Sequence, residues 1–222
     1  MLTLFFGSSS KAFQMIFKAF ISYRADSIRV LDVTYGKGRS WDNFVWDDLF
    51  NEVEVVKMDK VKYDGIELDV VSDHSIGLPF DDESFDVVYY DPPYYFREYV
   101  KSYDLKECEF EENEVFWTLD DFRCSLFGLR SEIPRVLKDG GFLICKIMDG
   151  YVGKLYFPNT FLVVNNFVLA GLSIVAHLIV PIQRRNYPDA LRVNHINYLV
   201  FCKNPSKDWY NCVFSPMDIP SQ

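Results

Sequence analysis

The stretch SIRVLDVTYGKG, residues 27–38, is an apolar strand that runs directly into a glycine turn. Its β-branched and aliphatic residues favour a strand over 27–33. Gly36 and Gly38 allow the backbone to turn tightly and to approach a ligand closely. The G-x-G-x-x-G pattern of dinucleotide enzymes is incomplete, because Trp41 stands in the place of its third glycine. The stretch therefore predicts either a plain turn or a nucleotide-type site unlike that of a nicotinamide enzyme.

The rest of the chain alternates strand and helix patterns. Further strands are expected at 53–58, 66–71, 85–90, 141–148, 172–180 and 196–203, and helices at 11–23, 41–50, 119–137 and 160–170. This alternation predicts an α/β fold with a doubly wound, mostly parallel sheet. The final two strands lack a connecting helix, so we expect an antiparallel hairpin at one edge. Residues 1–222 are expected to form a single domain, with 204–222 as a tail.

The composition is that of a soluble globular protein. The 222 residues are 49% hydrophobic and 25% charged, and the net charge is -9. This charge argues against an indiscriminate binder of polyanions but is compatible with a nucleic-acid enzyme that has local basic loops. The five cysteines form no C-x-x-C pair, which favours free thiols in a reducing cytoplasm over disulfides or a metal site.

The segment Phe161–Val180 has the length of a membrane span. The adjacent Asn165 and Asn166, and the glycine at 171, favour a buried helix, a turn and a strand instead. No basic stretch precedes the first apolar residues, so no signal peptide is expected. The sequence predicts a cytoplasmic protein without membrane contact.

Acidic residues follow two of the expected strands at positions that suit a nucleotide. Asp59 closes the second strand, at about the distance from the glycine turn where an acid can bind ribose hydroxyls. Asp73 precedes a turn and is the candidate for a second contact, with Asp69 as a competitor for the same role. The alternative for Asp73 is a loop acid that caps the following turn.

The stretch FDVVYYDPPYYF, residues 85–96, ends a strand on a carboxylate and a stiff aromatic turn. Asp91 accepts hydrogen bonds, and Pro92 and Pro93 fix the backbone so that the Pro92 carbonyl is a second acceptor. Tyr94 offers a flat face on which a base can stack. Two acceptors and a stacking face suit an amino group on a planar ring. The alternative is an ordinary turn with buried tyrosines.

Two long loops could select a substrate. Residues 95–119 are strongly acidic, which favours a solvated loop or a dimer contact over a phosphate surface. Residues 181–195, between the last two strands, are basic and suit phosphate and base-edge contacts, with an ordinary surface loop as the alternative. The candidate substrate-binding residues are Tyr95, Arg184, Arg185 and Arg192. Tyr95 could equally be a core residue.

Three stretches together carry a resemblance to a known family. LDVTYGKG at 31–38, LPFDDESFDVVYYDPPYY at 78–95 and VLKDGGFLICK at 136–146 resemble the S-adenosylmethionine-dependent amino-methyltransferases of DNA, the N6-adenine and N4-cytosine group. With Asp in the first place of its D-P-P-Y tetrad, the chain looks more like the adenine type, and like the short stand-alone members of phages and prokaryotes. Archaeal tRNA guanine-N2 methyltransferases also carry this tetrad.

The resemblance implies a class I methyltransferase-like (Rossmann-like) fold with a seven-stranded sheet and an antiparallel last strand. It also implies S-adenosyl-L-methionine as cofactor, and no metal is expected. The residues implied for catalysis are Asp91, Pro92, Pro93 and Tyr94. Those implied for cofactor binding are Asp32, Thr34, Gly36, Gly38, Asp59, Asp73, Phe6 and Ser8.

The function implied is methyl transfer to the exocyclic amino group of a nucleobase, with adenine N6 in DNA as the first choice. The target amine would attack the methyl group in line, and a base from duplex DNA would first be flipped out. Alternatives are an RNA or tRNA base methyltransferase, a methyltransferase of glutamine or small-molecule amines, and a non-catalytic partner subunit. No separate target-recognition domain is expected, so sequence selectivity would be short or assisted by a homodimer.

Overall fold

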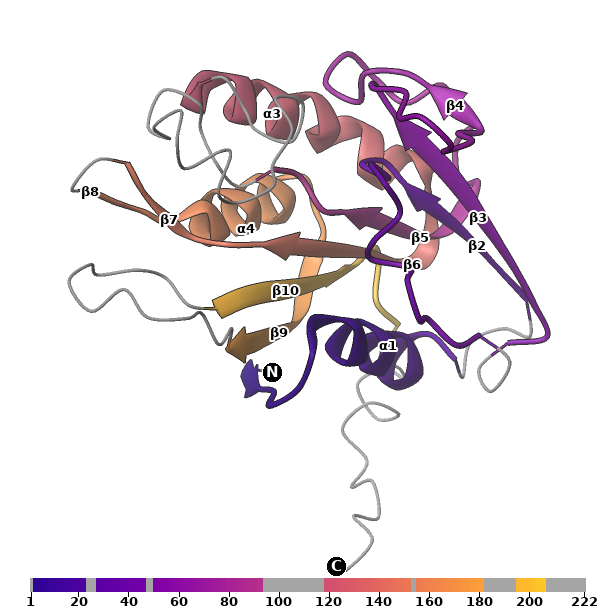
Figure 1. Cartoon of the computed structure of the whole chain (residues 1–222), viewed down its shortest axis with the longest axis horizontal. Coiled ribbons are helices and arrows are strands. Elements are labelled where there is room, and N and C mark those ends of the chain that lie inside the picture. Colours follow the sequence, from indigo (N-terminus) through magenta and orange to yellow (C-terminus); the bar gives the residue numbers. More distant parts are fainter. Residues whose placement is uncertain are drawn as a thin grey trace, which may run out of the picture.

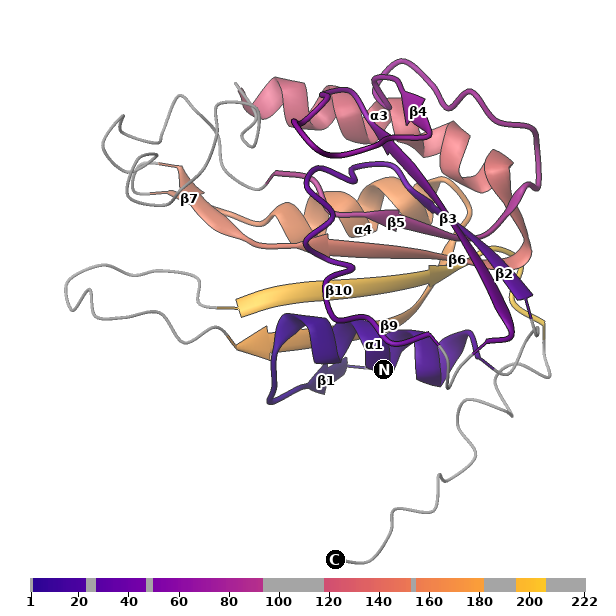
Figure 2. The same ribbon diagram turned by 45° about the vertical axis from the view of Figure 1, so that its right-hand side comes forward.

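A computed structural model describes residues 2–22, 27–46, 50–93, 118–152, 155–181 and 195–206. The elements are β1 Leu2–Leu4, α1 Ser9–Phe20, β2 Ser27–Asp32, β3 Glu52–Asp59, β4 Val70–Val71, β5 Phe85–Tyr90, α3 Leu119–Val136, β6 Leu137–Ile147, β7 Gly150–Val152, β8 Leu155–Phe157, α4 Asn159–Leu169, β9 Ser173–Pro181 and β10 His195–Cys202. In both views, α1 lies on one face of a twisted sheet and α3 and α4 lie on the other (Figure 1, Figure 2).

The main sheet has eight strands in the order β1-β9-β10-β6-β5-β2-β3-β4. The neighbours β3-β2, β2-β5 and β5-β6 are parallel, and β10 is antiparallel to both β6 and β9. The chain builds outward from β2 in one direction and then from β5 in the other, so the strand order reverses between these two strands. The structure confirms the doubly wound α/β class and the antiparallel last strand.

An eighth strand joins the seven that the resemblance implied. β1 pairs in parallel with β9 at the edge of the sheet, with Thr3 opposite Leu178. Three residues are too few for a periodic pattern to show, so the sequence gives no signal for it. The short hairpin β7–β8, which extends past the end of β6 (Figure 1), was likewise not expected.

Two hydrophobic cores hold the helices to the sheet. On one face, α1 buries Phe13, Ile16 and Phe17 against β2, β5 and β10, as its helical spacing predicts. The side chain of Ser8 accepts a hydrogen bond from Lys11 N at 3.2 Å and caps this helix. On the other face, α3 and α4 bury a second apolar cluster, which includes Leu129.

The connection from β2 to β3 corrects one prediction. A short helix was expected at 41–50, but the described residues of this segment, 41–46 and 50, are a turn followed by irregular backbone. Trp41 N donates to Gly38 O at 2.9 Å, and Phe44 N donates to Trp41 O at 3.1 Å, so the bonds follow a tight turn pattern. The rings of Trp41 and Phe44 lie 5.0 and 5.4 Å from that of Phe13. In the described residues of this connection, aromatic packing onto α1 therefore takes the place of a helix.

Two further segments test predicted boundaries. The third strand, expected at 66–71, is only Val70–Val71. The segment Phe161–Val180 contains most of α4, a turn at Gly171 and most of β9, as predicted. No described helix is long and apolar enough to cross a membrane.

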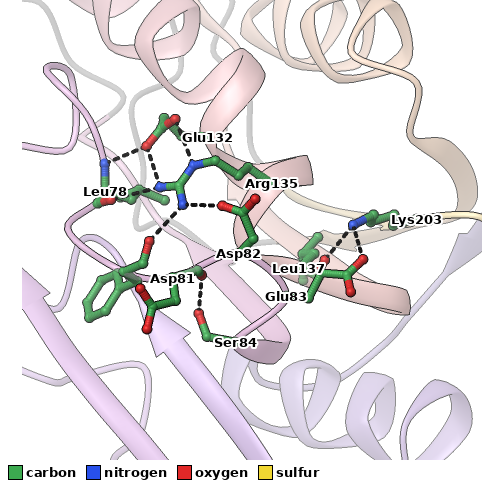
Figure 3. Close-up of polar contacts among 10 residues, drawn as sticks. Leu78, Asp81, Asp82, Glu83, Ser84, Glu132, Arg135, Leu137 and Lys203 are labelled. Atoms are coloured by element: carbon green, nitrogen blue, oxygen red, sulfur yellow. Dashed lines mark hydrogen bonds and ion pairs between the residues drawn. The ribbon is translucent and has the colours of Figure 1, made fainter.

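Arg135 of α3 anchors the loop that leads into β5 (Figure 3). Its guanidinium donates to the carbonyls of Leu78 and Phe80 at 2.9 and 2.7 Å, and pairs with Asp82 at 2.9 Å. Glu132 accepts from Leu78 N at 2.9 Å, and this bond completes the anchor. The network lies where β5 begins, at the edge of the sheet opposite the candidate site, and its role is structural.

Candidate active site

The residues selected from the sequence gather where the parallel strands end. Asp32 is the last residue of β2, Asp59 the last of β3, and Asp91 directly follows β5. Because these strands are parallel neighbours, their carboxyl ends share one edge of the sheet. This edge includes the point between β2 and β5 where the strand order reverses, which is where doubly wound sheets bind ligands.

The glycine turn after β2 is attached to both neighbouring strands. Gly36 and Gly38 have φ of +56° and +73°, a conformation that other residues adopt at a cost. Gly36 N donates to Asp59 Oδ2 at 2.8 Å, so the acid at the end of β3 holds the turn. A Cβ on Gly38 would lie 2.7 Å from the hydroxyl of Tyr35, so the Tyr35 side chain would have to shift to accommodate it.

Asp32 is almost fully buried, and both of its carboxylate oxygens accept hydrogen bonds from the turn. Oδ1 accepts from Thr34 N at 3.0 Å, and Oδ2 accepts from the indole N–H of Trp41 at 2.7 Å. Burial raises the pKa of Asp32 to about 7; the charges of Asp91 and Asp59 add to this, while the two hydrogen bonds oppose it. Asp32 therefore stabilises the conformation of the turn through these two hydrogen bonds.

Asp59 and Asp73 occupy the edge beyond β2. Asp59 is half-buried, and its Oδ1 accepts from Val61 N at 2.9 Å. Asp73 Oδ1 accepts from Ser75 N at 2.9 Å. Burial opposes the ionisation of Asp73, but its hydrogen bonds to Ser75 and the charge of Lys60 outweigh burial and lower its pKa. Both acids thus also cap their own turns.

Asp69, the competitor for the role of Asp73, is bound elsewhere. Its Oδ2 accepts from Lys57 N at 2.8 Å along β3. This bond extends the edge of the sheet where β4 is too short to do so. The geometry leaves Asp73 as the better candidate of the two for a ligand contact.

The turn that carries Asp73 packs closely on α3. His74 is buried, and its Nε2 lies 2.7 Å from the hydroxyl of Ser125. Burial lowers the pKa of His74 to about 4, so the imidazole is neutral at physiological pH. A Cβ on Gly128 would lie 2.2 Å from the carbonyl oxygen of Ser75. Gly128 therefore allows the Asp73 turn to lie directly on the helix backbone.

Asp91 is tied to the glycine turn through its main chain. Its N–H donates to Thr34 Oγ1 at 2.8 Å. Pro92, which follows, is buried, and Pro93 is half-buried. The first three residues of the D-P-P-Y tetrad thus lie beside the turn predicted to hold the cofactor.

The carboxylate of Asp91 meets three donors at one oxygen. Oδ2 lies 2.6 Å from Lys146 Nζ, 3.0 Å from Ser40 Oγ and 3.3 Å from the hydroxyl of Tyr89. The Lys146 and Asp91 side chains are each 16% exposed, so the ion pair is largely shielded from water. Lys146 carries no sequence signal for this role, because 55 residues separate it from Asp91 and only the pairing of β5 with β6 unites them.

The amino-terminal candidates approach the same edge from β1. Phe6 is 80% exposed, and Ser8 is the N-cap of α1. The hydroxyl of Ser9 lies 2.7 Å from that of Tyr198, and Tyr198 is the register partner of Lys146. Ser9 is thus the member of this segment that the structure connects to the strand beside Lys146.

Several predicted residues lie outside the described ranges. They are Tyr94, Tyr95, Arg184, Arg185 and Arg192. Their roles therefore stay predictions. Within the described ranges, no group of His, Cys, Asp or Glu side chains could hold a metal, and Cys124, Cys145 and Cys202 are free thiols.

The charges of the site favour a positively charged ligand. Asp32, Asp59 and Asp91 are close enough for two of them to raise the pKa of the third. Lys146 already compensates Asp91, and a further cation beside Asp32 and Asp59 would relieve the repulsion that remains. S-adenosyl-L-methionine, with a sulfonium and an ammonium group, fits this donor set better than a polyphosphate nucleotide would.

Comparisons with known proteins found no matching family model and no matching curated protein. Similar solved structures include a candidate DNA modification methylase from Thermus thermophilus complexed with S-adenosyl-L-methionine (17% identity, TM-score 0.44, 68% of this chain and 56% of that one). They include a SAM-dependent methyltransferase from Methanosarcina mazei (13%, 0.49, 83% and 96%) and a possible exported protein from Bordetella parapertussis (11%, 0.50, 89% and 67%). The chain spans about half the length of the Thermus protein. Identities this low describe the fold alone.

Proposed function

We propose that this protein is an S-adenosyl-L-methionine-dependent methyltransferase that acts on the exocyclic amino group of a nucleobase, with adenine N6 in DNA as the target. The observation that carries the proposal is the bond from Asp91 N–H to Thr34 Oγ1. It sets the beginning of the D-P-P-Y tetrad directly beside the glycine turn after β2. The site proposed for the amino group and the site proposed for the cofactor would then be neighbours, which supports the proposal.

The residues around the glycine turn suit the cofactor. The turn would hold its methionine part, with Asp32 shaping the turn from within and Gly36 and Gly38 giving close access. Asp59 would contact the ribose and Asp73 the adenine amino group. S-adenosyl-L-methionine supplies a methyl group bound to a positively charged sulfur, which makes that methyl an electrophile.

The chain's own contribution to the reaction is orientation and charge. The Asp91 carboxylate would accept a hydrogen bond from the target amine, with the Pro92 carbonyl as a second acceptor, so that the nitrogen lone pair is aligned. As positive charge develops on that nitrogen, the Asp91 carboxylate stabilises it. A nitrogen–methyl bond would form as the methyl–sulfur bond breaks and leaves its electron pair on sulfur, and the nitrogen would then lose one proton to solvent. Tyr94 would stack on the base.

A methyl-transfer assay tests the proposal. The protein is incubated with labelled S-adenosyl-L-methionine and, separately, duplex DNA made by PCR, the same DNA as single strands, and a tRNA transcript. Nucleosides are then identified by mass spectrometry. Label in N6-methyldeoxyadenosine is the expected result.

Asp91→Ala is the matched variant in this assay. Its rate of methyl transfer is expected to fall by about 100-fold or more, because a misplaced reacting group costs a factor of about this size. The variant should still bind the cofactor. Label only in guanosine or only in tRNA would contradict the DNA adenine target. Cofactor binding without any label would favour a non-catalytic partner subunit.

A further inference from the structure

The side of the sheet on which Lys146 lies directs it toward Asp91. Its neighbours on β6 alternate: Ile144 belongs to the core beneath α1, whereas Cys145 and Ile147 belong to the core beneath α3 and α4. Lys146 therefore projects to the α1 face. On β5, Tyr89 belongs to the α1-side core and Tyr90 to the other, so Asp91 projects to the α1 face as well.

Buried aromatic side chains lie on the two strands that flank Lys146. Tyr89 on β5 and Tyr198 on β10 are both buried, and their rings lie 4.5 and 6.0 Å from that of Phe13. A buried ion pair is weak evidence for stability, because desolvation offsets its attraction. The ammonium group therefore calls for an explanation other than stability.

The contacts of the ammonium group point to control of one carboxylate oxygen. Lys146 Nζ lies 2.6 Å from Asp91 Oδ2 and 3.4 Å from Ser40 Oγ. Ser40 itself donates to the same oxygen and accepts from Tyr89. Lys146 from β6 and Ser40 from the segment after the glycine turn thus donate to Oδ2, and the Tyr89 hydroxyl shares its single proton between Oδ2 and Ser40 Oγ. Together these contacts fix the rotation of the carboxylate.

We propose that Lys146 is a positioning residue for the proposed methyl transfer: its ion pair holds the Asp91 carboxylate in the orientation that receives the target amine. This inference rests on the proposed function. Lys146 also opposes the charge stabilisation that Asp91 offers to the reacting nitrogen, because its positive charge lies beside the carboxylate. Lys146 therefore raises the rate by orienting the Asp91 carboxylate and not by stabilising charge on the reacting nitrogen.

Steady-state methyl transfer to the PCR duplex tests the role of Lys146, with cofactor affinity measured separately by calorimetry. Lys146→Met is expected to lower kcat by about 100-fold, the cost of a misplacement of about 1 Å, with the cofactor Kd nearly unchanged. Lys146→Gln, which is neutral and polar, tests the same loss if the methionine variant does not fold. Lys146→Arg keeps the charge and should recover much of the rate.

The chain contains a matched control on the same pair of strands. Lys138, on β6, pairs with Asp86, on β5, at 2.9 Å, at the opposite edge of the sheet. Lys138→Met removes an ion pair between the same two strands and should leave kcat unchanged. A double-mutant cycle then tests whether Lys146 acts through Asp91 or independently of it. If it acts through Asp91, Lys146→Met should not lower kcat further in a protein that already carries Asp91→Asn.

Each outcome decides the proposal. A wild-type kcat in Lys146→Met overturns the proposal. So does a loss of kcat from Lys146→Met that is as large in the Asp91→Asn background as in the wild type. A weakened cofactor Kd that accounts for the whole defect overturns it in favour of a cofactor contact. A wild-type protein that transfers no methyl group to any of the nucleic acids overturns the proposed function, and this inference with it. Transfer by the wild type and undiminished transfer by Lys146→Met overturn the inference alone.

Discussion

The indole N–H of Trp41 donates to the buried carboxylate of Asp32 across 2.7 Å. Trp41 is the residue that breaks the dinucleotide pattern after Gly38. This departure from the pattern has a structural consequence: in place of a third glycine, the chain has an aromatic donor that satisfies the acid at the end of β2. The ring also packs on Phe13 of α1, so one side chain joins the glycine turn to the core.

Replacing this donor is expected to destabilise the fold. Trp41→Phe keeps an aromatic ring but leaves one oxygen of a buried carboxylate without its hydrogen bond. The free energy of unfolding should fall by about 1–3 kcal/mol, measured by chemical denaturation. Trp46→Phe is the matched control, because Trp46 stacks on Trp41 at 5.6 Å and does not bond to Asp32. An equal effect of both substitutions would contradict this role of Trp41.

The buried carboxylate should make stability depend on pH. Burial raises the pKa of Asp32 from 3.8 to about 7, so between these values the folded protein holds a proton that the unfolded chain has released. Stability from this group is therefore fully present below about pH 4 and is lost as pH rises to about 7, by about 1.4 kcal/mol per pH unit. Above that window both states are ionised.

Asp32→Asn removes this titration. The difference in unfolding free energy between wild type and Asp32→Asn should shift in favour of the variant from pH 4 to 7 and then level off. Denaturation curves at a series of pH values measure it. A constant difference across this range would contradict the raised pKa of Asp32.

Binding of a cationic cofactor should release protons near neutral pH. Positive charge near Asp32 favours its ionised form and lowers its pKa, so a proton leaves on binding. Calorimetry in two buffers with different ionisation enthalpies counts these protons. S-adenosyl-L-homocysteine lacks the sulfonium charge and should release fewer. Equal release by both ligands, or unchanged release in Asp32→Asn, would show that another group titrates.

A methyl group at Gly128 should disturb the Asp73 turn. Alanine gains about 1 kcal/mol of helix propensity over glycine, but its Cβ would lie 2.2 Å from Ser75 O, so the turn must move. Gly128→Ala should weaken cofactor binding several-fold, and overpacking should cost about 1–3 kcal/mol of stability. Gly150→Ala, where the added Cβ meets no described atom within 4 Å, is the control. Wild-type cofactor affinity in Gly128→Ala would argue against a contact from Asp73.

Local sequence patterns were enough to predict most helices and strands and the residues of the site that directly end or follow a strand. The strand predicted at 85–90 is β5 with the same bounds, and the helix predicted at 119–137 is α3 to within one residue. Both segments have the apolar periodicity of their element. The helix predicted at 41–50 is wrong for its described residues, 41–46 and 50, because the aromatic residues pack on α1 and this tertiary contact overrides local preference.

By itself, the sequence determined the order of seven strands of the sheet and of α1, α3 and α4, the glycine turn, and the acids at the ends of β2, β3 and β5. Each of these depends on residues within one strand and the turn that follows it. Only the tertiary structure decided that Lys146 binds the Asp91 carboxylate and that Asp32 is buried against Trp41. Strand pairing joins residues 55 positions apart, and a carboxylate becomes buried only when the aromatic segment folds over it. Such contacts arise from packing between segments, which no local pattern records.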